Sequence, residues 1–272
     1  MDHIPTELKF RSLYNVPFSD ILNVCRSSVE YRDICTDEDF WRLKAEYQLG
    51  IPPKIFNKTK LTAKNRFIQL YLQKYPIPGC DKYNSPFICL TGLLNLMAQG
   101  YTELQQFNTF ELLKYYLSMD HTLLVRTINP AALLGLNEVV IYILEEVRML
   151  DVQDLLMKSY LNAIDGATRG HQLELLNYLI TKSIELGKSK PIVLSVVLVA
   201  AAGEGFIDLL NWVWNQMSFL SPCQAIIEAI KKRQVVSLDF FKSKGVDINK
   251  CISGRSILNN QDINFINNYL RI

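Results

Sequence analysis

The chain has little of what enzyme active sites are usually built from. Its 272 residues include only three histidines, His3, His121 and His171, and no two of them lie four residues apart. There is no phosphate-binding loop of the type G-x-x-x-x-G-K-[ST], no G-x-S-x-G nucleophile turn and no H-E-x-x-H zinc motif. We therefore predict a protein without catalytic residues, bound metal or cofactor.

The cysteines also lack the spacing of a metal or redox site, because no two of them form a C-x-x-C pair. They are Cys25, Cys35, Cys80, Cys89, Cys223 and Cys251. Four of the six stand next to an apolar residue in the sequence, as small core side chains do. The sequence therefore favours reduced cysteines and a cytoplasmic location.

An excess of charge of one sign and a long hydrophobic run are absent as well. With a formal net charge of +2, the sequence gives no reason to expect nucleic acid or a membrane surface as a partner. Residues 1–10 carry charge and a proline where a signal peptide needs an apolar core, so export is not expected. The most apolar run, Ile192–Ala202, is shorter than the roughly 20 residues of a membrane-spanning helix, and we predict a buried helix there.

Apolar residues recur at helical spacing along most of the chain. Segment after segment places them at i, i+3, i+4 and i+7, whereas alternating runs bounded by hairpin turns are almost absent. The predicted fold class is therefore all-α. Prolines at positions 52, 53, 76, 78 and 86 cannot lie inside helices, so we place a linker with one helical segment at 51–86, between two architectures.

Three short helices are predicted before this linker, in residues 1–50. The first follows Pro5, the second follows Pro17, and the third opens at Thr36-Asp37-Glu38-Asp39, which has the pattern of a capping box. A unit of this size buries only about 60% of the surface that its unfolded chain exposes. We therefore expect it to rest on a partner or on the domain that follows.

The same N-terminal stretch contains an ordered series of short motifs. Ile4-Pro5-Thr6-Glu7-Leu8 is followed by Val16-Pro17, Asp20-Ile21-Leu22, Val24-Cys25-Arg26 and Phe40-Trp41. In order and spacing this series resembles the F-box motif. The resemblance implies binding to the Skp-family adaptor of a cullin-RING ubiquitin ligase. The contact or supporting residues that it implies are Ile4, Pro5, Leu8, Pro17, Ile21, Leu22 and Cys25.

The apolar residues of this stretch have a second interpretation. They would then form only the core of a helical cap on the second domain, and the protein would be a ligase-independent scaffold that sequesters a partner. This alternative predicts that Leu8, Ile21 and Leu22 are buried within the chain. Docking to an adaptor predicts instead an exposed apolar patch.

A short pattern recurs after the linker, in residues 87–272. In four copies an acid, two aliphatic residues and a later aromatic residue keep their order, and weaker copies follow at Val236–Phe241 and Asn264–Leu270. The aromatic positions are Tyr115, Tyr142, Tyr178, Trp212, Phe240 and Tyr269, which are 27, 36, 34, 28 and 29 residues apart. Small residues and a glycine or turn precede each middle copy, as a tight turn between two close helices requires. The predicted unit is a helix pair that buries its apolar face by stacking on its neighbours.

Two stretches of this second domain, Ala167–Leu179 and Lys244–Asn249, resemble ankyrin repeats, although the T-P-L-H start is missing from every copy. The resemblance implies about six degenerate repeats that hold a protein target. His171 resembles the turn histidine of that family, which implies a hydrogen bond that stabilises the turn. Proteins that join an F-box to such repeats are encoded in large families by giant DNA viruses and some intracellular bacteria. If the chain is viral, the resemblance implies the host cytoplasm or nucleus.

Two tryptophans are the candidates for the target-binding site. Trp212 and Trp214 lie two residues apart on one predicted helix, so they cannot both face inward. We expect the aromatic residues of the repeats to lie in the core, with one of these two tryptophans exposed or covered by the neighbouring repeat. An exposed tryptophan on such a surface is a binding hot spot. The whole chain is then predicted to act by proximity, holding a target beside the ubiquitin-conjugating machinery.

Overall fold

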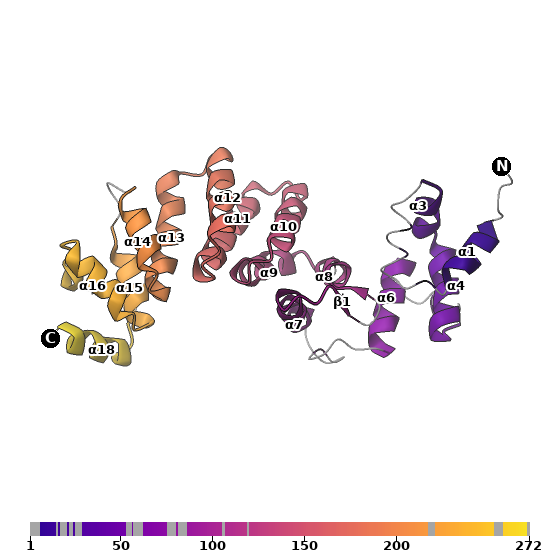
Figure 1. Cartoon of the computed structure of the whole chain (residues 1–272), viewed down its shortest axis with the longest axis horizontal. Coiled ribbons are helices and arrows are strands. Elements are labelled where there is room, and N and C mark those ends of the chain that lie inside the picture. The colour runs from indigo at the N-terminus through magenta and orange to yellow at the C-terminus, as the bar shows by residue number, and fades with distance from the viewer. Residues whose placement is uncertain are drawn as a thin grey trace. The chain divides into compact units, whose positions relative to one another are not determined.

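The structure, a computed structural model of the chain, consists of helices with a very short hairpin (Figure 1). Two compact units make it up, Met1–Leu123 and Leu124–Ile272. The residues that the structure describes are 6–14, 16, 21, 24, 29–52, 56, 62–74, 80, 86–104, 107–118, 120–216, 221–252 and 258–270. Nearly all regular structure in these residues is helical, so the predicted all-α class is confirmed.

The N-terminal unit combines short helices with an antiparallel pair of two-residue strands. Its elements are α1 (Thr6–Tyr14), α3 (Val29–Thr36), α4 (Glu38–Leu49), α6 (Ala63–Lys74), α7 (Pro86–Ala98), β1 (Glu103–Leu104), β2 (Phe107–Asn108) and α8 (Thr109–Leu117). Helices α1 and α4 cover the first and third helices predicted before the linker. Helix α3 was not predicted from the sequence, and most of the second predicted helix lies outside the described residues.

Helix α4 has a capped N-terminus, one residue later than the capping box indicated. Asp37 is the N-cap, and its carboxylate accepts hydrogen bonds from the backbone N–H groups of Asp39 and Phe40. Thr36 instead ends α3 and donates its hydroxyl to the carbonyl oxygen of Asp33. The aspartate suits this position because its negative charge also interacts favourably with the N-terminal end of the helix dipole.

The core of the N-terminal helices is aromatic. Phe40 and Trp41 of α4 are buried, and Phe10 of α1 meets Phe40 edge-on with ring centroids 5.5 Å apart. The indole N–H of Trp41 donates to the carbonyl oxygen of Cys35 at 2.8 Å. This bond satisfies the one polar group of the buried indole and holds α4 against the end of α3.

Helix α6 packs against α4 and extends this core. Phe67 of α6 is fully buried with its ring centroid 5.6 Å from that of Trp41. The Glu38 carboxylate accepts a hydrogen bond from the backbone N–H of Ala63, the first residue of α6. Residues 62–74 are therefore part of the N-terminal unit, whose end at Leu123 differs from the linker predicted at 51–86. Prolines end helices, but they do not prevent the helices on either side of them from packing together.

The C-terminal unit is a series of helix pairs (Figure 1). Its helices are α9 (Thr122–Leu133), which begins just before the boundary between the units, α10 (Asn137–Met149), α11 (Gln153–Arg169), α12 (Leu173–Glu185), α13 (Lys190–Glu204), α14 (Ile207–Trp214), α15 (Cys223–Lys231), α16 (Val235–Ser243), α17 (Ile248–Ile252) and α18 (Asn260–Leu270). The first helices of successive pairs pack side by side, α11 against α13 and α13 against α15.

Helix α13 is the buried helix predicted from the apolar run. It begins at Lys190 and places residues 200–203 in the core, where small side chains let neighbouring helices approach closely. In the part of the chain that the structure describes, no helix combines the length and the apolar character needed to cross a membrane.

One turn recurs between the two helices of a pair. Its positions of positive φ are Gly135 (71°), His171 (54°), Gly205 (81°) and Arg233 (57°). The backbone N–H of the next residue donates to the carbonyl oxygen five positions before it, as in a Schellman motif. That acceptor belongs to an alanine in each turn: Ala131, Ala167, Ala201 and Ala229. The four turns are 36, 34 and 28 residues apart, which is the spacing of the aromatic positions that follow them.

Helices α9 and α11 come close enough for their backbones to touch. Gly166 and Gly170 lie one turn apart at the C-terminal end of α11. A Cβ atom on Gly166 would overlap the carbonyl oxygen of Asn129, and one on Gly170 would overlap that of Leu133. Only residues without a side chain allow this approach, which explains the glycines that precede the turn in the sequence.

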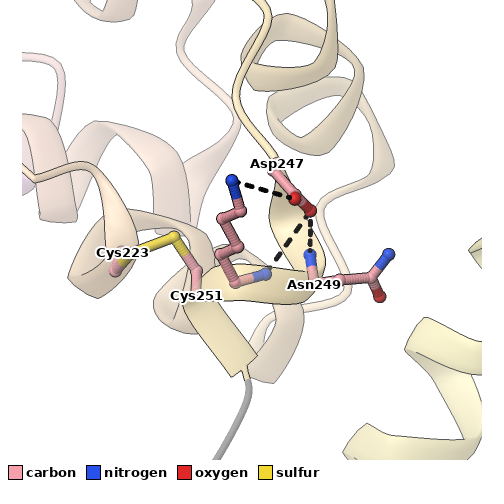
Figure 2. Close-up of a disulfide and its surroundings, with 5 residues drawn as sticks. Cys223, Asp247, Asn249 and Cys251 are labelled. Carbon is pink, nitrogen blue, oxygen red and sulfur yellow. Dashed lines mark hydrogen bonds and ion pairs between the residues drawn. A yellow bond between two sulfur atoms is a disulfide. The ribbon is translucent and has the colours of Figure 1, made fainter.

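The cysteines in the described residues are disulfide-bonded, so the prediction of reduced thiols is wrong for this structure. Cys223 at the start of α15 is bonded to Cys251 in α17 (Figure 2), and Cys80 is bonded to Cys89 in α7. The first pair was not predicted because its members are 28 residues apart in the sequence, whereas the fold brings their Cα atoms to 4.8 Å. That distance suits a disulfide.

Candidate protein-binding surfaces

The residues that the F-box resemblance assigns to adaptor binding are described only in part. Ile4, Pro5, Pro17, Leu22 and Cys25 lie outside the described residues, and Leu8 is in α1 with its side chain outside them too. Ile21 is fully buried. Of the two roles predicted for it, contact or support, its burial fits support of the core.

An apolar strip on α4 is exposed beside this core. Leu43 and Tyr47 lie one turn apart, so their side chains share a face of the helix, and they are 38% and 59% exposed. The Tyr47 ring lies 5.8 Å from the ring of Tyr14 at the end of α1. Val29, at the start of α3, is 69% exposed. Sequence reasoning missed these residues, because a helical pattern marks which positions are apolar and not which of them the chain leaves uncovered.

A buried lysine closes the end of α1. Lys44 has no exposed surface, and its ammonium nitrogen lies 3.3, 3.0 and 2.8 Å from the carbonyl oxygens of Leu13, Tyr14 and Val16. The same nitrogen lies 5.8 Å from the centre of the Phe67 ring. Leu13 and Tyr14 lie at the end of α1, where carbonyls lack intrahelical donors, and the lysine donates to both and to Val16. The Val16 N–H also bonds to the carbonyl oxygen of Leu13. Lys44 thereby links α1, α4 and α6.

The burial of Lys44 makes the stability of the N-terminal unit depend on pH. Burial lowers the pKa of Lys44 from 10.5 to about 7. Between these two values the unfolded chain binds more protons than the folded chain, so the unfolding free energy should rise as the pH rises from 7 toward 10.5. Urea unfolding followed by Trp41 fluorescence, in a background with Trp212→Phe and Trp214→Phe, measures this slope.

The variant Lys44→Met is the control for this dependence. Methionine lowers the unfolding free energy at every pH because the three carbonyls lose the ammonium group as a donor, but it cannot titrate. We expect the variant to lose the rise of unfolding free energy with pH. An equal slope in the variant and its parent would show that other groups cause the dependence.

The sequence predicted that the aromatic residues of the repeats lie in the core, and the structure places only some of them there. Tyr115, Phe240 and Tyr269 are buried, whereas Tyr178 and Trp212 are 39% and 38% exposed. The prediction failed at Tyr178, because helical spacing was taken to place all repeat aromatics on one buried stripe, whereas exposure of one of the two tryptophans was expected.

Trp212 and Trp214 lie in different surroundings, as expected for residues two positions apart on one helix. The Trp214 ring packs edge-on against Phe240 and Phe241 of α16, with ring centroids 5.9 and 6.1 Å away. Trp212 instead lines a groove between α12 and α14, of about 320 Å³. The groove is lined by Leu173, Leu176, Asn177, Ile180, Asp208, Leu209 and Trp212. The structure thus identifies Trp212 as the exposed member of the pair.

His171 and Asp208 join the two helix pairs at the end of this groove. The imidazole Nε2 of His171 lies 2.9 Å from an oxygen of Asp208, and its ring lies 4.6 Å from that of Phe206. Some burial opposes ionisation of Asp208, but hydrogen bonds from His171 and from the Leu209 N–H outweigh it and lower the pKa of this carboxyl. The hydrogen bond of the His171 side chain therefore goes to the next helix pair.

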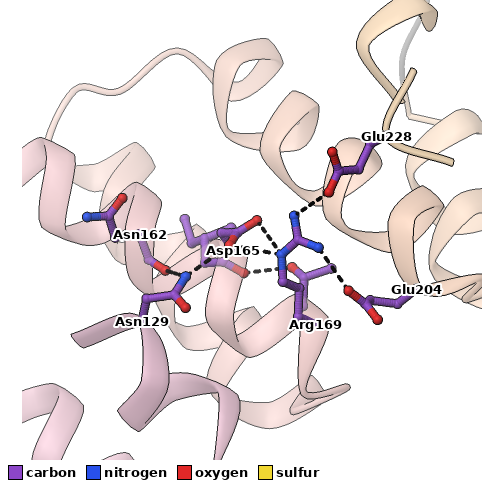
Figure 3. Close-up of polar contacts among 8 residues, drawn as sticks. Asn129, Asn162, Asp165, Arg169, Glu204 and Glu228 are labelled. Carbon is purple, nitrogen blue, oxygen red and sulfur yellow. Dashed lines mark hydrogen bonds and ion pairs between the residues drawn. The ribbon is translucent and has the colours of Figure 1, made fainter. Parts of the chain in front are cut away.

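Arg169 connects three neighbouring first helices through a polar network (Figure 3). Its guanidinium donates to Asp165 on the same helix at 3.1 Å, to Glu204 of α13 at 2.8 Å and to Glu228 of α15 at 3.2 Å. Asp165 also accepts a bond of 2.9 Å from the side-chain amide of Asn129 on α9. The network therefore holds successive helix pairs in register.

No group of three His, Cys, Asp or Glu side chains in the described residues has the arrangement of a metal site. Each of the two surfaces above presents large apolar side chains that are partly exposed, Leu43 and Tyr47 on α4, and Leu173 and Trp212 at the groove, which suits contact with another protein. Comparisons with protein families, with curated proteins and with solved structures gave no match for this chain.

Proposed function

We propose that the protein is a substrate-recruiting adaptor of a cullin-RING ubiquitin ligase of the SCF type. The F-box-like helices bind the Skp-family subunit, and the ankyrin-like repeats bind the target. The chain itself contributes no chemical step. It acts by proximity, because holding a target near the charged conjugating enzyme raises the effective concentration of the target lysine there.

The observation that carries this proposal is the exposed apolar strip of Leu43 and Tyr47. A small helical unit that leaves two large apolar side chains on one face, with Val29 exposed in the neighbouring helix, gains stability when another protein covers them. The strip belongs to the same small helical unit as the motifs that resemble an F-box, Ile4–Leu8 and Phe40–Trp41.

The recurring helix pairs support the second half of the proposal. Successive pairs use the same left-handed turn, and Trp212 stands exposed on a second helix beside an apolar groove. Exposed tryptophans surrounded by apolar contacts are the residues that most often dominate protein–protein affinity. A chain with one apolar surface in each unit can hold two partners at once.

Binding to a purified Skp-family adaptor tests the proposal. We expect a complex with the full chain in calorimetry, and affinity reduced about tenfold or more by Pro5→Ala with Leu8→Ala, or by Leu43→Ser with Tyr47→Ser. The matched control is Ile88→Ser, because Ile88 is 49% exposed in the same unit but lies outside the F-box-like stretch. Circular dichroism must show native helicity in each variant. A helical full chain that does not bind the adaptor contradicts the proposal.

A ligase-independent scaffold is the second candidate, and the burial of Ile21 favours it. In that case the N-terminal helices serve the chain's own core, and the protein sequesters its partner without ubiquitin transfer. The two candidates differ in a reconstituted ubiquitination reaction that contains the full chain, the adaptor, the cullin and a captured partner. Ubiquitin on the partner supports the adaptor function, whereas capture without ubiquitin supports the scaffold.

A further inference from the structure

The groove between α12 and α14 combines an apolar floor with an acidic border. Leu176, Ile180 and Leu209 are buried at its base, while Leu173 and Trp212 are partly exposed, 48% and 38%. Its volume of about 320 Å³ is at the lower end of the roughly 300–1,000 Å³ of pockets that hold small ligands. This space suits one or two bulky side chains of a partner.

Among the residues that line the groove, Asp208 carries the charge, and its carboxylate is also bonded to His171. Residues 172–181 and 205–216, which supply its two walls, contain the acids Glu174 and Asp208 and no lysine or arginine. Asp208 lines the groove itself and its side chain is 59% exposed. Lys182, the next cation along α12, is already paired with Glu185 at 2.7 Å. A cation brought by a partner would therefore meet the carboxylate of Asp208 and the indole of Trp212, and both attract it.

We propose that this groove binds a protein segment in which a bulky apolar side chain is flanked by arginine or lysine. The apolar side chain enters between Leu173 and Trp212, and the basic residue lies over Trp212 toward Asp208. This inference rests on the proposed function only in taking the repeats as the part that binds the target. It adds the chemistry of the target that the groove selects.

A random peptide library displayed on phage, selected on the full chain, tests this chemistry. Peptides that also bind the variant Trp212→Ala are removed before sequencing. We expect the remaining peptides to be enriched in arginine or lysine next to a large apolar residue. Enrichment of acidic peptides, or no enrichment after the removal step, overturns the proposal.

Charge substitutions at Asn177 separate recognition from damage to the fold. Asn177 is exposed and lines the groove, so either charged residue fits there. For a selected basic peptide, we expect Asn177→Asp to strengthen binding and Asn177→Arg to weaken it, each by about threefold at low salt, with both effects shrinking as salt screens the charges. Changes in the same direction for both variants overturn the electrostatic part of the proposal.

Tyr178→Ala is the matched control, since Tyr178 is 39% exposed on the same helix and does not line the groove. It should leave peptide affinity unchanged while Trp212→Ala reduces it about tenfold. Adaptor binding, measured on the same proteins, should be unaffected by both substitutions. If none of the proteins binds the adaptor, the proposed function is contradicted, whereas the inference about the groove is not. The chain's own 231–236 carries the same chemistry, with three cations and two valines. Self-association that Trp212→Ala abolishes would overturn the assignment to a separate partner.

Discussion

Replacing Gly170 with alanine is expected to lower the unfolding free energy of the C-terminal unit by about 3 kcal/mol. The new Cβ would overlap the carbonyl oxygen of Leu133 and lie 2.8 Å from its carbonyl carbon. These atoms are backbone at the end of α9, so no change of rotamer relieves the overlap and the two helices must separate. At about 2–4 °C per kcal/mol, thermal unfolding should shift down by about 6–12 °C.

Gly187→Ala is the control for this substitution. Gly187 has a φ of 88° and a Cβ there would meet no atom within 4 Å, so alanine costs only the strain of the left-handed backbone, about 1 kcal/mol. Gly166→Ala should resemble Gly170→Ala, because its Cβ would overlap the carbonyl oxygen of Asn129. Equal melting temperatures for Gly170→Ala and Gly187→Ala would show that α9 and α11 are further apart than in this structure.

Replacing Arg169 with methionine is expected to destabilise the C-terminal unit by about 2–3 kcal/mol. Methionine keeps much of the packing, but Glu204 and Glu228 lose their shared cation while remaining 29% and 23% exposed. Two partly buried carboxylates from neighbouring helices then face each other without a partner. Urea unfolding of the variant measures the loss.

The pairing can be tested by removing the charges that Arg169 neutralises. In the Arg169→Met background, Glu204→Gln with Glu228→Gln should recover part of the lost stability, because neutral amides need no cation. Lys182→Met breaks an ion pair whose two side chains are 44% and 55% exposed, so it should leave the melting temperature nearly unchanged. If Arg169→Met is as mild as Lys182→Met, the network does not hold the helix pairs together.

The helix pairs were predictable from the sequence because their signal is local. An acid, aliphatic residues and an aromatic residue recur within seven positions of a left-handed turn, and small residues mark the preceding helix. The turns at Gly135, His171 and Gly205 were predicted from the glycines in or just before them, whereas the turn at Arg233, which has none, was not. His171 and Arg233 adopt the same positive φ, and nothing in a single sequence distinguishes a non-glycine residue in that conformation.

The interactions that cross the fold were not predictable. Arg169 bonds to acids 35 and 59 residues away, and Lys44 bonds to carbonyls about 30 residues before it. The spacing of residues within one helix therefore cannot reveal either set of bonds. In the sequence both residues resemble ordinary solvated cations. The disulfide between Cys223 and Cys251 was missed for the same reason, since only the packing of α15 and α17 brings the two together.

The shared turn geometry has a consequence for how this chain can change length. Each second helix starts from the same backbone conformation and the same hydrogen bond to an alanine, at Gly135, His171, Gly205 and Arg233 alike. A segment that runs from one turn to the next, such as 136–171 or 172–205, therefore ends with the same turn conformation as the segment before it. Either segment can be joined to the next helix through the same backbone geometry. Duplication or deletion of such a cassette preserves each junction, which lets recombination within a gene add or remove binding surface without redesigning a loop.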